Sequence, residues 1–152
     1  MSRALQDKTV IVTGAGQSVG RAVARRAAEE GARVMLACED AKGLAETVKD
    51  LGGDGARVGH FGCNLEQRLS VTNLLSATKD AYGRIDVLVD AARNSATGAF
   101  LDVDGDAFDA AYTDNVRNVF TLAQATARRM IAQSEDDPDF RGAIVTVTSI
   151  AA

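Results

Sequence analysis

Gly14, Gly16 and Gly20 are the residues whose types and spacing point most directly to chemistry. They follow the β-branched run 9–12, which is typical of a strand buried on both faces. Apolar residues then recur every four positions, as on a helix, at Val19, Val23 and Ala27. Backbone N–H groups and the dipole at such a helix start favour a phosphate. The stretch therefore predicts a phosphate-binding turn, although a tight strand–helix turn without a ligand has the same outline.

The other reactive residue types form no metal or redox pattern. Cys38 and Cys63 make no Cys-x-x-Cys pair, and His60 has no companion ligands in the sequence. The acidic stretch 134–139 is interpreted as a solvated loop. We therefore expect no bound metal, and reduced thiols in a cytoplasmic protein.

Charge and hydropathy exclude two classes of partner. The 17 Lys and Arg residues against 21 Asp and Glu residues leave a net charge of -4, whereas a nucleic-acid surface needs a clustered basic face. No apolar run has the length of a membrane span, and residues 1–7 lack the apolar core of a signal peptide. We expect neither a nucleic acid nor a membrane as partner.

Alternating strand and helix patterns predict a doubly wound parallel α/β sheet in a single domain over residues 1–152. Strands are expected at 9–12, 33–38, 57–63, 85–89 and 143–150. Asp40 and Asn64 are expected to cap helices, and a short helix at 102–112 leads into a long one. The long helix bears the apolar residues Val116, Val119, Phe120, Ala123, Ala127, Met130 and Ile131. In the strand order 3-2-1-4-5, a ligand crevice lies between the first and fourth strands.

The glycine turn resembles that of the short-chain dehydrogenase/reductase family. The family's turn reads Thr-Gly-x-x-x-Gly-x-Gly, and here Ser18 stands at the middle glycine between Thr13-Gly14 and Gly20. The similarity extends along the whole chain. It implies a Rossmann-type fold of strand order 3-2-1-4-5, an NAD or NADP cofactor, a small alcohol or carbonyl substrate, and a homo-oligomer, dimer or tetramer, built through the long helix.

The resemblance also implies which residues bind the cofactor. They are Gly14, Gln17, Ser18, Val19, Gly20, Cys38, Glu39, Asn64, Leu65, Ala91, Ala92 and Arg93. Asn64 stands where the family has an aspartate that accepts from the adenine amino group, and an amide oxygen can still accept. Glu39 and Gln17 favour NAD over NADP, because an acid at the end of the second strand binds ribose hydroxyls and repels a 2′-phosphate.

The stretch after the fourth strand departs most from the family. Asn-Asn-Ala-Gly there becomes Asp90-Ala91-Ala92-Arg93 in this chain. Arg93 replaces a glycine beside the cofactor path. It is expected either to clash with the cofactor or to pair with one of its phosphates.

Two catalytic positions of the family have counterparts. Asn115 matches the asparagine that holds a water in the proton path, and Ser149 matches the serine that hydrogen-bonds the substrate oxygen. The family's Tyr-x-x-x-Lys pair, whose lysine lowers the tyrosine pKa from about 10, is missing. Neither Tyr82 nor Tyr112 has a lysine four residues later.

The chain is therefore expected to be inactive by itself. We expect it to be truncated after the fifth strand, as the N-terminal part of a longer polypeptide or with the remainder disordered or cleaved. The fifth strand would then be an open, β-branched sheet edge.

Three functions stay open. The first is an NAD(P)-dependent oxidoreductase whose catalytic and substrate-binding part lies outside this chain. The second is a non-catalytic nucleotide-binding or interaction module, motivated by Ser18, Asp90 and Arg93. The third is a methyltransferase, against which Thr13-Gly14 argues.

Overall fold

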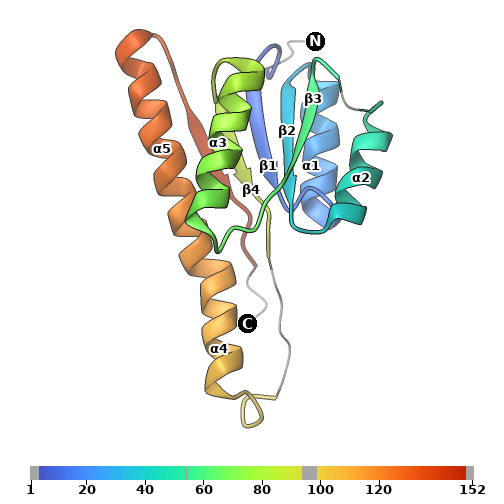
Figure 1. Cartoon of the computed structure of the whole chain (residues 1–152), viewed down its shortest axis with the longest axis vertical. Helices are drawn as coiled ribbons and strands as arrows, with labels where there is room; N and C mark the ends of the chain where they lie inside the picture. Colours follow the sequence, from blue (N-terminus) through green and yellow to red (C-terminus); the bar gives the residue numbers. More distant parts are fainter. Residues whose placement is uncertain (1–3, 54, 94–98, 150–152) are drawn as a thin grey trace.

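The fold is an alternation of strands and helices, seen in a computed structural model that describes residues 4–53, 55–93 and 99–149. The elements are β1 (Thr9–Thr13), α1 (Ser18–Glu29), β2 (Arg33–Cys38), α2 (Ala41–Asp50), β3 (Val58–Gly62), α3 (Arg68–Tyr82), β4 (Val87–Asp90), α4 (Gly105–Tyr112), the π-turn η1 (Thr113–Arg117), α5 (Asn118–Asp136) and β5 (Ala143–Thr146). Parallel pairings place the strands in the order β3-β2-β1-β4-β5 (Figure 1). The predicted strand order is confirmed, with β1 at the centre.

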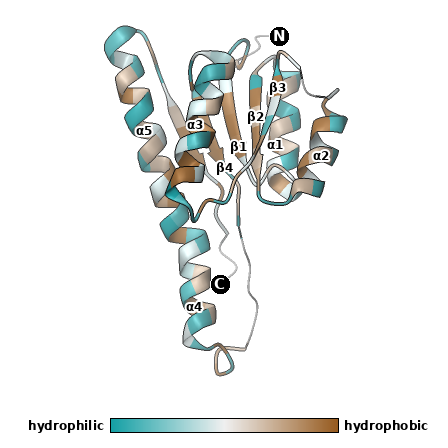
Figure 2. Cartoon of the chain, viewed as in Figure 1, coloured by the Kyte–Doolittle hydropathy of each residue, from teal (hydrophilic) through white to brown (hydrophobic). Residues whose placement is uncertain are grey.

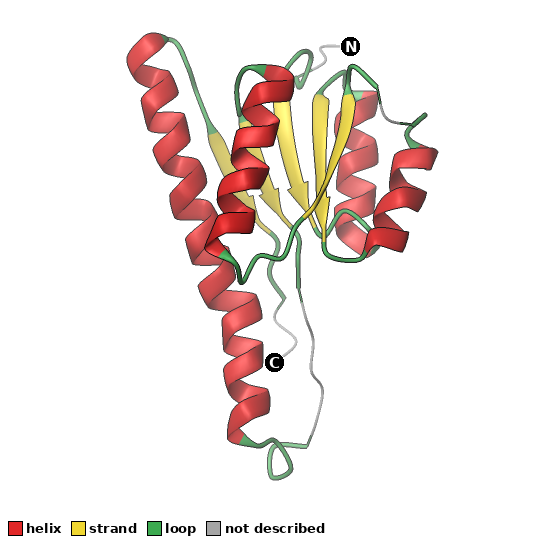
Figure 3. Ribbon diagram, in the orientation of Figure 1, coloured by secondary structure: helices red, strands yellow, loops and turns green. Residues whose placement is uncertain are grey.

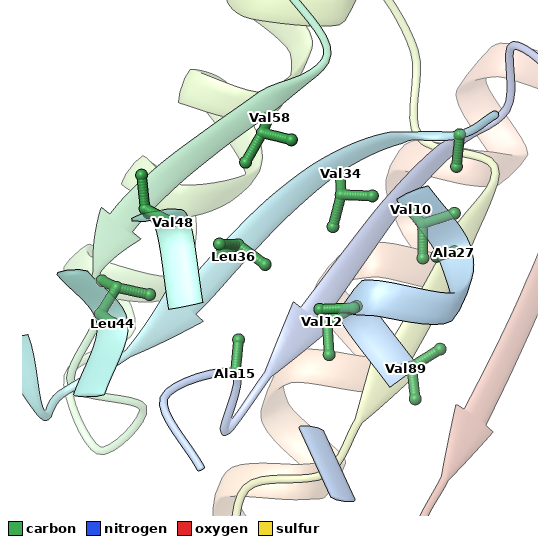
Figure 4. Close-up of a cluster of buried hydrophobic side chains, with 12 residues drawn as sticks. Val10, Val12, Ala15, Ala27, Val34, Leu36, Leu44, Val48, Val58 and Val89 are labelled. Carbon is green, nitrogen blue, oxygen red and sulfur yellow. The ribbon is translucent and has the colours of Figure 1, made fainter. Parts of the chain in front are cut away.

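Helices cover both faces of this sheet (Figure 3). On one face, Val10 and Leu36 pack with Leu44 in a core beneath α1 and α2 (Figure 4). On the other, Ile11 and Leu122 belong to a core beneath α3 and α5. Neighbouring side chains on a strand point to opposite faces, so Val10 and Ile11 enter different cores. Figure 2 shows the central strands as predominantly hydrophobic, as expected for strands covered on both sides.

A continuous helical stretch runs from α4 through η1 into α5 (Figure 1). The buried residues of α5 are Asn118, Leu122, Thr126 and Met130. Val116 and Phe120, which contribute to the predicted apolar period, are instead 49% and 63% exposed. The helix exists as predicted, but much of its apolar stripe faces away from the sheet. Within the described part of the chain, no helix has both the length and the apolar character needed to cross a bilayer.

Some predicted boundaries differ from the structure. Asp40 caps α2 as expected, accepting a hydrogen bond from a backbone N–H at 3.1 Å. Asn64 does not cap α3, because that helix begins only at Arg68. The short helix begins at Gly105 rather than at 102 and is continuous with the long one. β5 ends at Thr146, and residue 150 of the predicted fifth strand lies outside the described residues.

Candidate functional site

The turn between β1 and α1 is packed so closely that two of its glycines have no room for a side chain. Gly14 has a φ of 61°, and a Cβ there would lie 2.6 Å from the carbonyl oxygen of Ala91. A Cβ on Gly20 would collide with the carbonyl oxygen of Gly14. Because both obstacles are backbone atoms, the turn itself requires these glycines.

Helix α2 packs directly against the same turn. A Cβ on Gly16 would lie 3.2 Å from the carbonyl carbon of Gly43. The Thr47 hydroxyl donates to the carbonyl oxygen of Ala15 at 2.8 Å. The turn is therefore held between the end of β1 and the first turns of α2.

Ser18 has a backbone conformation that is typical of glycine, the residue at this position in the turn Thr-Gly-x-x-x-Gly-x-Gly. Its φ is 47°, in the left-handed region that L-residues rarely occupy. Gln17 precedes α1 in an extended conformation, and its side chain does not cap the helix. The first N–H groups of α1 have no acceptor within the helix, so they are suited to an anion.

A cavity of about 520 Å³ opens beside this turn, at the carboxyl ends of β1 to β4. Seven of the predicted cofactor residues line it, namely Gly14, Gln17, Cys38, Glu39, Leu65, Ala92 and Arg93. The other lining residues are Thr13, Ala37, Asp40, Cys63, Glu66, Asp114 and Asn118. The volume lies within the range of small-molecule sites in proteins.

The other predicted cofactor residues lie near the cavity without lining it. Ser18 and Val19 are exposed at the start of α1, and Gly20 is buried beneath the turn. Ala91 donates its backbone N–H to the Thr13 hydroxyl oxygen at 3.2 Å. Asn64 uses its amide oxygen to accept from a backbone N–H of its own loop, at 2.9 Å.

Charge in the cavity wall is divided unevenly. The acids Glu39 and Asp40 come from the end of β2, while Glu66 and Asp114 lie on the loop after β3 and on η1. Arg93 is exposed, and among the described residues that line the cavity it carries the positive charge. An anionic group entering this cavity would therefore be attracted most strongly to the side formed by Arg93 and the start of α1.

A buried hydrogen-bonded pair lies at the end of β1 and β4. Thr13 donates its hydroxyl to Oδ1 of Asp90, and both residues are almost fully buried. Oδ2 of Asp90 is buried without a hydrogen-bond partner among the described residues. Burial raises the pKa of Asp90, and the hydrogen bonds from Thr13 and from the backbone of Ala92 offset part of this increase.

The two thiols at the cavity differ in environment. Cys63 is buried, and burial raises its pKa, while a hydrogen bond from the Ser70 hydroxyl at 3.5 Å acts in the opposite direction. Cys38 is partly exposed. The two side chains pack in the cores on opposite faces of the sheet. No described His, Cys, Asp and Glu side chains form a group of three or more able to hold a metal ion.

The predicted catalytic residues are not among those lining the cavity. Asn115 lies on η1, where Nδ2 donates to the carbonyl oxygen of Ala111 at 2.9 Å. Ser149 is exposed beyond the end of β5. Instead, the same helical stretch contributes Asp114 and the buried Asn118. Asn118, three positions after Asn115, is a polar residue that could have been proposed from the sequence as a cavity residue. Hydropathy alone did not reveal which side of the helix faces the cavity.

Comparison with known proteins identifies the family. The sequence model described as short chain dehydrogenase matches residues 8–152. L-rhamnose 1-dehydrogenase (NAD(P)(+)) of Azotobacter vinelandii is 37% identical over 155 residues, covering 97% of this chain and 57% of the relative. A short-chain type dehydrogenase/reductase from Mycobacterium marinum has 30% identity and a TM-score of 0.86, covering 98% of this chain and 58% of that structure.

A second solved structure shares the fold at lower identity. It is 3-ketoacyl-(acyl-carrier-protein) reductase from Brucella melitensis complexed with NADH, with a TM-score of 0.85 and 22% identity, covering 96% of this chain and 59% of that one. The chain thus spans a little over half the length of these proteins. Since the family match takes in every strand and helix described above, the chain belongs to the short-chain dehydrogenase/reductase family.

Proposed function

We propose that this chain binds NAD(H) in the cavity beside the Gly14–Gly20 turn, as the cofactor-binding part of an oxidoreductase. The observation that carries the proposal is the position of that cavity, at the carboxyl ends of the strands where the sheet order reverses. When bound, the nicotinamide would exchange a hydride with an alcohol or carbonyl substrate.

The donor and acceptor groups of the cavity fit a dinucleotide. N–H groups at the start of α1, together with the Arg93 guanidinium, suit the pyrophosphate. The carboxylate of Glu39 suits the ribose hydroxyls, and the apolar side chain of Leu65 suits an adenine face. Each of these three side chains lines the cavity. Arg93 is exposed at the cavity wall, where a guanidinium can pair with a phosphate.

The acids Glu39 and Asp40 support NAD over NADP, because a 2′-phosphate beside them would be repelled. The relative from Azotobacter vinelandii is named for NAD(P)(+), and the Brucella melitensis neighbour carries NADH. The preference for NAD in this chain therefore rests on its own carboxylates.

Titration calorimetry with the purified chain tests this proposal. We expect NADH to bind more tightly than NADPH, and S-adenosylmethionine not to bind. Arg93→Ala should weaken NADH binding several-fold by removing a phosphate contact. A tighter NADH complex in Arg93→Ala would instead mean that Arg93 obstructs the cofactor, and no binding of either dinucleotide by the unaltered chain would reject the proposal.

A non-catalytic nucleotide-binding module is the second candidate, because Ser18, Asp90 and Arg93 depart from the cofactor-binding pattern of the family. A longer gene product containing that segment, and reducing carbonyl substrates with NADH, would favour the oxidoreductase. Binding without turnover in the full-length gene product would favour the module.

We also propose that this protein lies in the cytoplasm, where Cys38 and Cys63 stay reduced. A further proposal is self-association through the side of the helical stretch α4–η1–α5 that faces away from the sheet. The supporting observation is a stripe of exposed apolar residues four positions apart: Phe108, Tyr112, Val116 and Phe120. Light scattering coupled to size-exclusion chromatography should detect a dimer or tetramer. Val116→Asp with Phe120→Asp should convert it to a monomer, and a monomeric unaltered chain would contradict the prediction for this chain.

A further inference from the structure

Asn64 and Glu39 form a hydrogen-bonded pair at the edge of the cavity. Glu39 follows β2 and Asn64 follows β3, and these two strands are neighbours in the sheet. Their pairing continues through a hydrogen bond from the N–H of Cys63 to the carbonyl oxygen of Cys38, at 3.1 Å. The residues that follow therefore lie side by side. Nδ2 of Asn64 donates to Oε1 of Glu39 at 2.9 Å.

A second contact fixes which end of the Asn64 amide faces Glu39. Oδ1 of Asn64 accepts from the backbone N–H of Glu66 at 2.9 Å. A reversed amide would place its NH₂ group against that N–H and its oxygen against the Glu39 carboxylate, so both contacts would become repulsive. The loop after β3 thus presents a hydrogen-bond donor to Glu39.

Glu39 gains its orientation from this donor. Its side chain is exposed, and it lines the cavity together with the acids Asp40, Glu66 and Asp114. An exposed glutamate samples many rotamers, and neighbouring acids add repulsion that favours an outward position. A hydrogen bond to a carboxylate is stronger than one between neutral groups, so the Asn64 amide can hold Glu39 at the cavity wall.

We propose that Asn64 is a positioning residue for Glu39, and that the pair sets the preference of this site for NADH over NADPH. The inference rests on the dinucleotide binding proposed above. An aspartate at position 64 would keep the oxygen that accepts from Glu66 but would replace the NH₂ group with a second carboxylate oxygen. Glu39 would then be repelled into solvent, and its discrimination against a 2′-phosphate would be lost.

Binding titrations of NADH and NADPH to the full chain test this inference. Asn64→Asp should raise the Kd for NADH about tenfold and reduce the ratio of NADPH to NADH Kd values. Asn64→Ser keeps a side-chain acceptor for the loop but lacks the reach to Glu39, so it should reduce the ratio by a smaller factor. Asn73→Asp is the matched control: it makes the same chemical change at an exposed position of α3 and should leave both Kd values unchanged.

Rescue separates positioning from a general loss of structure. In a Glu39→Gln background, the new side-chain amide can donate to an aspartate at position 64, so Asn64→Asp should have less than about a threefold effect there. An equal effect in both backgrounds, or an Asn64→Asp variant that binds like Asn73→Asp, would overturn the inference while leaving the proposed function intact. Failure of the unaltered chain to bind either dinucleotide would overturn both.

Discussion

Thr13 and Asp90 are paired across β1 and β4 and are joined by a hydrogen bond from the Thr13 hydroxyl to the Asp90 carboxylate. The same hydroxyl oxygen accepts from the backbone N–H groups of Ala91 and Ala92, at 3.2 and 3.3 Å. Thr13 therefore organises the segment that leads from β4 to the cavity. The cost of this arrangement is a buried acid with one oxygen unpaired among the described residues.

We expect Asp90→Asn to raise the free energy of unfolding at pH 7 by about 1 kcal/mol, because a neutral amide is easier to bury than a carboxylate. Since burial raises the pKa of folded Asp90, the stability that its protonated form contributes is complete below the ordinary pKa of 3.8 and is lost as the pH rises through the higher folded pKa. The advantage of the variant should therefore grow from acid to neutral pH.

Urea unfolding of both proteins at several pH values measures that difference. Asp109→Asn makes the same chemical change at an exposed position of α4 and serves as the control, with an expected change in the free energy of unfolding at pH 7 of less than about 0.5 kcal/mol. A stability difference for Asp90→Asn that is constant from acid to neutral pH would contradict the role given to burial.

Ser18→Gly should stabilise the chain by roughly 0.5 kcal/mol or more. Glycine removes the strain of a φ of 47°, which outweighs its greater freedom in the unfolded state. Ser134→Gly, in the right-handed backbone of α5, should instead destabilise by about 0.5–1 kcal/mol. Chemical denaturation compares the two variants, and a loss of stability in Ser18→Gly would show that the serine side chain contributes more than its backbone strain costs.

Gly20→Ala should destabilise the chain by about 2 kcal/mol, because its Cβ meets backbone atoms of Gly14 that can move only if the turn moves. Gly105→Ala provides the contrast, since no atom lies within 4 Å of a Cβ built there. That variant should be neutral or stabilised by up to about 1 kcal/mol. Equal stabilities of the two variants in thermal or urea unfolding would mean that the turn adapts freely.

Cys38 should react with a maleimide much faster than Cys63 in the folded chain. Cys38 is partly exposed at the cavity, whereas Cys63 is buried and has a raised pKa, which lowers its thiolate fraction. Mass spectrometry of the labelled peptides measures both rates. Saturating NADH should protect Cys38, and Cys38→Ser should leave a chain that is labelled only on unfolding; rapid labelling of Cys63 in that variant would count against its burial.

Sequence reasoning succeeded where a pattern is local and has one physical solution. The β-branched runs and the glycines that end helices predict alternating elements, and parallel pairing with short connections then leaves few strand orders. Gly31, for example, has the left-handed φ of 84° that its place after α1 suggests. The seven predicted residues that line the cavity came from the family resemblance, position by position, rather than from the strand pattern.

Side-chain direction was harder to predict. Asn118 and Thr126 are polar yet face the core, while Phe120 and Ile131 are apolar yet exposed. Of the predicted apolar stripe, Met130 is buried, so hydropathy marked only part of the buried side of the long helix. Asn64 has a side chain suited to a helix cap, but its loop continues to Arg68 before α3 begins. These choices depend on tertiary contacts that no short stretch of sequence contains.

The packing of α2 against the glycine turn lowers the entropic cost of binding a phosphate there. Gly16 and Gly43 are in close contact, and the Thr47 hydroxyl donates a hydrogen bond to the carbonyl oxygen of Ala15. Helix α2 therefore holds the turn in place in the ligand-free protein. A phosphate would bind to backbone N–H groups that are already aligned, so the turn would lose little conformational entropy on binding. The buried N–H of Ala15, which donates to the carbonyl oxygen of Ala37 at 3.3 Å, should accordingly exchange slowly even in the ligand-free protein.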